Sequence, residues 1–247
     1  MPEASAPSPP FRQSRVSFRK TSLVDYPGRV AAALFLPGCG LRCPWCQNRE
    51  LVLPGAGASL TGLEEALSHL EKRRRLLGGV VISGGEPSGH PALGPLIEEI
   101  HALGLPVKLD TNGMNPEALG RLFEAERSRP DYIALDLKLA PERYRELLPA
   151  GAESPADPAP ALRESAALIR SSGAAHEYRS LALPGAYFGP ADVEALAPLA
   201  EERAPWYFRS FAPGNCLDPA WDRLSPPGTA EALAGMARRL GKNALAR

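Results

Sequence analysis

The stretch Cys39-Gly40-Leu41-Arg42-Cys43-Pro44-Trp45-Cys46 contains three of the four cysteines in the chain. Their spacing, C-x3-C-x2-C, places three thiols on one short loop, where they can converge on one metal centre. Three thiolates are one ligand fewer than a four-cysteine site needs. A cubane iron–sulfur cluster held by three cysteines keeps one iron free to bind a further molecule, and this interpretation is favoured.

A structural zinc site with Cys216 as its fourth ligand is the main alternative for this loop. Zinc ligands usually come as paired C-x2–4-C units, which favours the cluster over zinc. A trio of cysteines without a metal is a third interpretation. Cys216 as a cluster ligand would remove the open iron, so we expect it to be a free thiol.

Composition narrows the class of protein. The 247 residues are 44% hydrophobic, which is enough to bury a sizeable core without disulfides. The 28 basic and 28 acidic residues cancel, so bulk charge indicates neither a nucleic-acid nor a membrane partner. No apolar run approaches the ~20 residues of a membrane span, and the N-terminus has no apolar signal segment. We therefore expect a cytoplasmic protein.

Strands and helices are predicted to alternate along the chain, which indicates βαβ units and a parallel sheet. Six units are too few for a closed eight-stranded barrel. The predicted fold is α/β with an open or partial barrel, and a doubly wound flat sheet is the alternative. Residues 1–13 are predicted to be a disordered tail, 14–227 the barrel and 228–247 a C-terminal helix. The predicted core strands are 30–36, 80–82, 106–109, 132–135, 176–183 and 206–211.

Unusual polar clusters directly follow the first four predicted core strands. The cysteine loop follows the first, and Gly84-Gly85-Glu86-Pro87 follows the second. Asp110-Thr111-Asn112-Gly113 and Asp136-Leu137-Lys138 follow the third and fourth. In parallel α/β folds the site lies at the carboxyl edge of the strands, so we expect these clusters to converge there.

This combination resembles the radical S-adenosylmethionine superfamily, whose signature is C-x3-C-x-φ-C with an aromatic φ, here Trp45. The resemblance implies a partial (β/α)6 barrel and a [4Fe–4S] cluster on Cys39, Cys43 and Cys46. It also implies S-adenosylmethionine bound to the open iron through its amino and carboxylate groups, with Trp45 against the adenine. Gly84, Gly85 and Glu86 resemble the motif that helps to bind the methionine amino group. A simple turn is the alternative for that motif.

Two further motifs resemble those of glycyl-radical-enzyme activases. In the pyruvate formate-lyase activase type, the residues that match Asp110, Thr111 and Asp136 form a monovalent-cation site beside the cofactor carboxylate. Asn112 and Lys138 belong to the same motifs and are expected to bind the cofactor. The alternatives are an Asx-turn at Asp110 and a surface ion pair between Asp136 and Lys138.

Arg179, in the predicted strand 176–183, aligns loosely with an activase arginine that contacts S-adenosylmethionine. A structural carboxylate such as Glu177 is the alternative partner for its guanidinium. His90 and Cys216 receive no role.

The lead-in from Lys20 to Gly28, together with Cys46-Gln47-Asn48, resembles anaerobic ribonucleoside-triphosphate reductase activating proteins. The resemblance implies reductive cleavage of S-adenosylmethionine to a 5′-deoxyadenosyl radical, which abstracts a hydrogen atom from a glycine of a partner enzyme. That partner would be anaerobic ribonucleotide reductase, with reduced flavodoxin or ferredoxin as the electron donor.

Two departures from the activase pattern are visible. Four cysteines leave none for an inserted ferredoxin-like domain, and Gln47 stands where many relatives have histidine. Two alternatives for the function remain open. One is a radical S-adenosylmethionine enzyme that acts on a small molecule, peptide or RNA. The other is a zinc-stabilised α/β module without enzymatic activity.

Overall fold

The computed structural model describes residues 10–53, 55, 59–151, 157–184, 187–225 and 229–247. Its centre is a sheet of nine strands in the order β3-β1-β2-β4-β5-β6-β7-β8-β9. Six parallel neighbours form the barrel wall, as predicted. They are β2 (Ala31–Leu36), β4 (Gly79–Gly84), β5 (Val107–Thr111), β6 (Tyr132–Asp136), β7 (Ala175–Ala182) and β8 (Trp206–Ser210).

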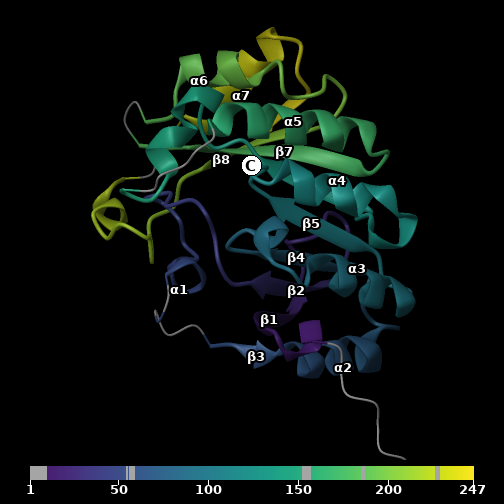
Figure 1. The fold of residues 1–247 in the computed structure, drawn as a ribbon. Coiled ribbons are helices and arrows are strands. Elements are labelled where there is room, and N and C mark those ends of the chain that lie inside the picture. Colours follow the sequence, from purple (N-terminus) through teal and green to yellow (C-terminus); the bar gives the residue numbers. More distant parts are fainter. Residues whose placement is uncertain (1–9, 54, 56–58, 152–156, 185–186, 226–228) are drawn as a thin grey trace, which may run out of the picture.

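The order of these six strands follows the chain without a reversal. A doubly wound sheet reverses its strand order at a switch point, so the flat-sheet alternative is wrong. Figure 1 shows the helices following one side of the sheet in an arc, as in a partial barrel. They are α2 (Leu63–Arg73), α3 (Leu93–Ala102), α4 (Pro116–Glu124), α5 (Pro158–Ser171), α6 (Pro190–Leu196) and α7 (Ala230–Arg239).

Alternation along the strands divides the sheet into two faces. Ile82, Leu109 and Ile133 are in register on neighbouring strands and are fully buried in the core. The side chain of Asp136, three residues after Ile133 on β6, faces the opposite side of the sheet, where Asp136 stands in register with Arg179 of β7. The period of two therefore places apolar residues in the core and charged residues in the interior of the barrel.

The sheet extends beyond the six core strands at both edges. β1 (Arg15–Ser22) pairs antiparallel with β2, and the short β3 (Thr61–Gly62) pairs with β1. The range 228–247, predicted as a helix, holds α7 followed by β9 (Ala244–Ala246), which pairs parallel with β8. Alternation is too short in β3 and β9, which have two and three residues, to be recognised in a sequence.

The predicted tail 1–13 is partly folded. Residues 1–9 lie outside the described residues. Pro10–Gln13 form a short 3-10 helix, and Arg12 donates to Glu99 of α3 at 2.7 Å. The prediction of disorder is therefore wrong for residues 10–13.

Two of the helices begin differently. Asn115 caps α4, because its side chain accepts from the amide of Ala118 with Pro116 at the first position. The N-cap of α2 is Gly62, without a side-chain cap, rather than the preceding Thr61. Thr61 pairs with Val16 in β3 instead. Within the described residues, no helix is both long and apolar enough to span a membrane.

Candidate cofactor site

The cysteine loop lies at the carboxyl end of β2, as predicted. Cys39, Cys43 and Cys46 are free thiols, and all three line one cavity of about 480 Å³. Cys43 is buried and the other two are partly exposed. Pockets of about 300–1,000 Å³ are typical for small-molecule and cofactor sites. Three reduced thiols on one wall of such a cavity fit the ligand set of a cluster with an open iron.

Asn112 and the loop backbone support the Cys39 sulfur. The amide of Leu41 donates to the Cys39 sulfur at 3.4 Å, and the Asn112 side chain donates to it at 3.8 Å. Hydrogen bonds to a ligating sulfur stabilise its thiolate and tune a cluster. Asn112 thus donates a hydrogen bond to Cys39 and also lines the cavity.

Gly84 and Gly85 hold the cysteine loop rather than simply leaving room for a ligand. A Cβ on Gly85 would lie 2.0 Å from the carbonyl oxygen of Gly38, and one on Gly84 would lie 2.2 Å from that of Leu36. Backbone hydrogen bonds join the same segments: the Gly85 amide donates to Leu36 at 2.9 Å, and the Glu86 amide to Gly38 at 2.7 Å. The two glycines allow β4 to press against the start of the cysteine loop.

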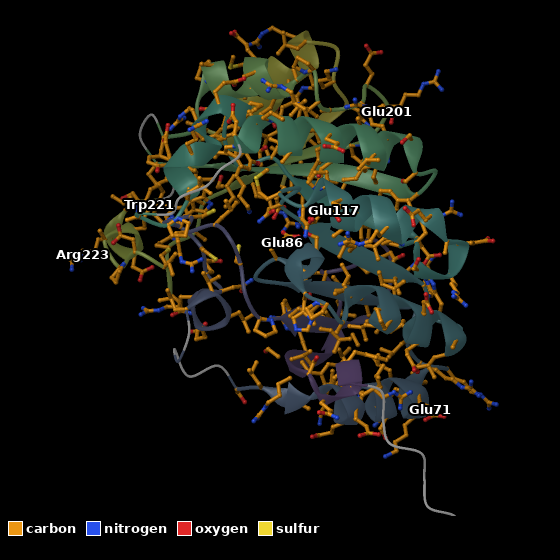
Figure 2. The ribbon with its side chains drawn as sticks, in the orientation of Figure 1. Glu71, Glu86, Glu117, Glu201, Trp221 and Arg223 are labelled. Carbon is orange, nitrogen blue, oxygen red and sulfur yellow. The ribbon has the colours of Figure 1, made fainter. Side chains whose placement is uncertain are left out.

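Glu86 is buried, and its carboxylate joins the ends of β4 and β5 through hydrogen bonds. Its Oε1 accepts from the Ser88 hydroxyl at 2.6 Å, the Ser88 amide at 3.1 Å and the Thr111 hydroxyl at 2.7 Å. Its Oε2 accepts from the Asn112 amide at 2.7 Å. Burial raises the pKa of Glu86, although these hydrogen bonds favour the carboxylate. Figure 2 shows Glu86 inside the molecule, and Gly85 is the residue of this motif that lines the cavity.

Asp110, Asp136 and Arg179 form a network of ion pairs on the interior face. Arg179 donates to Asp136 at 2.8 Å and lies 3.2 Å from Asp110. Lys138 lies 3.2 Å from Asp136, and the buried Lys108 pairs with Asp110. The alternative of an Asp136–Lys138 ion pair is thus present, and Arg179 has structural carboxylate partners. Glu177, the alternative considered for Arg179, instead accepts from Tyr132 at 2.8 Å.

These ion pairs fix the charge states in the cavity. Burial alone would raise the pKa of Asp136, but Arg179 and Lys138 hold this pKa below its usual range. Burial alone would lower the pKa of Lys138, but Asp136 holds it above its usual range. Burial raises the pKa of Cys43 to about 12, and the charge of Lys138 acts against that rise. Lys138 is therefore a cation suited to balance thiolate charge.

Trp45 has neighbours that the sequence did not reveal. It is 5% exposed and packs against Tyr187 and Trp221, each with ring centroids 5.4 Å away. One edge of the indole still lines the cavity. Figure 2 places Trp221 at the side of the molecule, on the segment that covers the cysteine loop.

The segment 211–224 covers the cysteine loop. Gln47 donates to the carbonyl of Ala212 at 2.8 Å, and the Asp218 amide donates to Pro44 at 3.0 Å. The role of Gln47 in this structure is therefore to join the two segments. Cys216 lies in the covering segment, fully buried, and its amide donates to Asp222 at 3.0 Å.

Among the residues with predicted roles, nine line the cavity and four lie outside its lining. The nine are Cys39, Cys43, Trp45, Cys46, Gly85, Asn112, Asp136, Lys138 and Arg179. The four are Gly84, Glu86, Asp110 and Thr111. His90, to which no role was given, lines a separate cavity between α3 and α4. In the part of the chain that the structure describes, no three His, Cys, Asp or Glu side chains are grouped to hold a single metal ion.

The sequence interpretation missed Lys108, Trp221 and Arg209. Lys108 could have been recognised, because it lies two residues before Asp110 and therefore on the same face of β5. Arg209 lines the cavity from β8, where it lies two residues after Tyr207, which stands in register with Arg179. Trp221 had no local signal, because only the path of the chain after β8 brings it to Trp45.

The partial barrel and the three-cysteine cavity define a class of cofactor-dependent radical enzymes. The radical SAM superfamily model matches residues 34–172, more than half of the chain. The chain belongs to the radical SAM superfamily. This membership implies a [4Fe–4S] cluster and S-adenosylmethionine as cofactors, makes the chain an enzyme, and replaces the zinc-stabilised module as an interpretation.

Relatives differ in how much of the chain they match. A protein of Methanocaldococcus jannaschii, provisionally named a glycyl-radical enzyme activating enzyme, is 27% identical over 222 residues, covering 90% of this chain and 87% of that protein. The 7-carboxy-7-deazaguanine synthase of Hyperthermus butylicus is 41% identical over 93 residues, covering 37% of this chain and 38% of the synthase.

A solved structure supports the fold. The radical SAM methyltransferase from Sphaerobacter thermophilus has a TM-score of 0.66 at 15% identity, covering 95% of this chain and 77% of that chain. At this identity the likeness shows the shared fold alone.

Proposed function

We propose that this chain is an activating enzyme that generates a glycyl radical on a partner, anaerobic ribonucleoside-triphosphate reductase. The observation that carries the proposal is the similarity to the archaeal protein named as a glycyl-radical enzyme activating enzyme, because it spans 90% of this chain. The resemblance of residues 20–28 and 46–48 to reductase-activating proteins supports this choice of partner.

Different residues of the cavity would bind the cluster and S-adenosylmethionine. Cys39, Cys43 and Cys46 would hold the cluster, and Gly85 would bring the backbone close to S-adenosylmethionine. Trp45 offers an aromatic edge to the adenine. When bound, the cluster and S-adenosylmethionine supply reductive cleavage of a C–S bond and an organic radical.

The charges of the cavity count against acid–base chemistry by Asp136. Asp136 is paired with Arg179 and Lys138, and Asp110 is paired with Arg179 and Lys108. A general acid or base needs a pKa near the working pH, whereas these contacts move the pKa of Asp136 away from it. The pairs instead hold the Arg179 guanidinium and the Lys138 ammonium in the wall of the cavity.

The monovalent cation expected beside Asp110, Asp136 and Thr111 is not needed for this proposal. Arg179 and the two lysines already neutralise the two carboxylates, and the Thr111 hydroxyl donates to Glu86. The electron donor that we propose is reduced flavodoxin or ferredoxin, on the family resemblance alone.

Action on a small molecule is the second candidate. The identity of 41% with a 7-carboxy-7-deazaguanine synthase favours it, although that match covers 37% of this chain. The two candidates share the cofactors and differ in where the hydrogen atom is taken from.

Electron paramagnetic resonance tests the proposal. The chain is reconstituted with iron and sulfide, reduced, and mixed anaerobically with S-adenosylmethionine and purified anaerobic ribonucleotide reductase. We expect a glycyl radical signal on the reductase, and none with the Cys43→Ala variant. Formation of 5′-deoxyadenosine without a glycyl radical on the reductase would refute the proposed partner. The same result with every other glycyl radical enzyme tested would refute the activase function and favour the small-molecule candidate.

A further inference from the structure

Arg209 lies in the wall of the cofactor cavity, near the end of β8. It is exposed, and it stands in register with Leu181 of β7, which lines the same cavity. Its guanidinium forms no hydrogen bond or ion pair with any residue that the structure describes. An arginine aimed into a cavity without a counterion is available to an anionic group of a bound molecule.

The other charges that line the cavity are already paired. Asp25 lies 3.0 Å from Arg19, and Asp136 holds Arg179 and Lys138 at 2.8 and 3.2 Å. Arg209 is thus the one ionisable side chain lining this cavity, other than the cysteines, that has no partner among the described residues. The cavity therefore offers a positive charge that none of the described residues neutralises.

Lys138, rather than Arg209, is suited to balance the thiolates. Its charge acts on both Cys39 and Cys43, against the rise in pKa that burial causes. Arg209 instead belongs to the part of the wall formed by Leu181, Ser210 and Phe211. The unused charge thus lies on the wall formed by β7 and β8, whereas the cysteines lie on the loop after β2.

We infer that Arg209 is a specificity-determining residue that binds a carboxylate of the molecule whose hydrogen atom is abstracted. The inference rests on the proposed function, and it adds the chemical class of the substrate: a glycine-containing segment with an acidic side chain close to the target glycine. A guanidinium donates to both oxygens of a carboxylate in one plane, so it also fixes the orientation of the segment.

Matched peptides test the inference. The probes are capped seven-residue alanine peptides with a central, deuterated glycine and a glutamate at each other position in turn, with glutamine or lysine versions as controls. Dissociation constants are measured by fluorescence anisotropy with labelled peptides and the cluster-loaded protein in the presence of S-adenosylmethionine. Deuterium transfer into 5′-deoxyadenosine is measured in parallel.

Three variants separate the role of the charge from other effects. In the wild type, we expect the best glutamate peptide to bind about tenfold more tightly than its glutamine version. Arg209→Gln should abolish this ratio, and Arg209→Glu should reverse it in favour of the lysine peptide. Arg223→Gln is the matched control, because Arg223 is exposed, lies outside the cavity lining and removes the same charge. Figure 2 shows Arg223 at the outer edge of the molecule.

Several outcomes would overturn the inference. They are an unchanged glutamate-to-glutamine ratio in Arg209→Gln, an equal loss of the ratio in Arg223→Gln, or no binding of any glutamate peptide to the wild type. A loss of partner-free S-adenosylmethionine cleavage as large as the loss of peptide affinity would also overturn it, by assigning Arg209 to the cofactor. Acid-selective binding without deuterium transfer would support the role of Arg209 and count against the activase function.

Discussion

Replacement of Gly85 by alanine is expected to destabilise the protein and displace the cysteine loop. The added Cβ would lie 2.0 Å from the carbonyl oxygen of Gly38 and 2.6 Å from its carbonyl carbon. Both neighbours are backbone atoms, so relief requires β4 and the start of the loop to separate by roughly 1 Å, since ordinary contacts between these atoms exceed 3 Å.

The magnitude follows from what that separation breaks. Two backbone hydrogen bonds join the segments, from Gly85 to Leu36 at 2.9 Å and from Glu86 to Gly38 at 2.7 Å. Their loss costs about 1 kcal/mol each, and overpacking adds about 1–3 kcal/mol. We therefore expect the free energy of unfolding to fall by about 3–5 kcal/mol, a large part of the roughly 5–15 kcal/mol typical of a folded domain.

Urea titration of the cluster-free protein and iron content after anaerobic reconstitution are the two assays. Gly89→Ala is the matched control, because a Cβ at Gly89 meets no atom within 4 Å and the residue lies four positions further along the chain. A Gly85→Ala protein within about 1 kcal/mol of the wild type, with full iron content, would refute the reasoning from backbone contact.

Three further predictions concern the cysteines, the ion pairs and the covering segment. Cys39→Ala, Cys43→Ala and Cys46→Ala should each abolish reductive cleavage of S-adenosylmethionine and lower the bound iron, whereas Cys216→Ala should retain both; loss of iron in Cys216→Ala would show a fourth ligand. Asp136→Asn should lower the free energy of unfolding at neutral pH by about 2 kcal/mol, because Arg179 loses a charged partner. The pKa of Asp136 is held below its ordinary value of 3.8, so its contribution is present above that pH and is lost as the pH falls. Urea titrations of the cluster-free protein below pH 4 should therefore show a shallower loss for Asp136→Asn, and identical acid profiles would contradict this. Trp221→Ala should cost about 3–5 kcal/mol and reduce cluster loading, while Trp221→Phe should retain most of both; equal urea midpoints for Trp221→Ala and the wild type would refute the packing argument.

The positions of the main elements could be predicted because the chain repeats a simple pattern. Apolar runs such as 30–36 mark buried strands, here β2, although Val30 lies before the strand and is exposed, and the polar clusters that follow them mark the carboxyl edge of the sheet. The three cysteines could likewise be assigned to one cavity from their spacing. These inferences depend on residues close together in the chain.

The roles of individual polar side chains could not be predicted in the same way. Glu86 has the composition of a cofactor ligand, yet both of its oxygens are occupied by Ser88, Thr111 and Asn112. Lys108 neutralises Asp110 from the same strand, and Trp221 reaches Trp45 across 176 positions of the chain. Such partnerships depend on strand register and on the path of distant segments, which local patterns do not encode.

The hydrogen bonds of Glu86 affect which parts of this site can change in sequence. Glu86 joins the ends of β4 and β5, and the glycines before it fasten β4 to the cysteine loop, so three loops form one mechanical unit. Arg209 and Leu181 stand outside that unit, on β8 and β7. Substitutions on those two strands can therefore change which molecule is bound while the frame around the cysteines is inherited intact. Strands β7 and β8 can therefore vary in sequence, because the hydrogen bonds that hold the cysteine loop lie on β4 and β5.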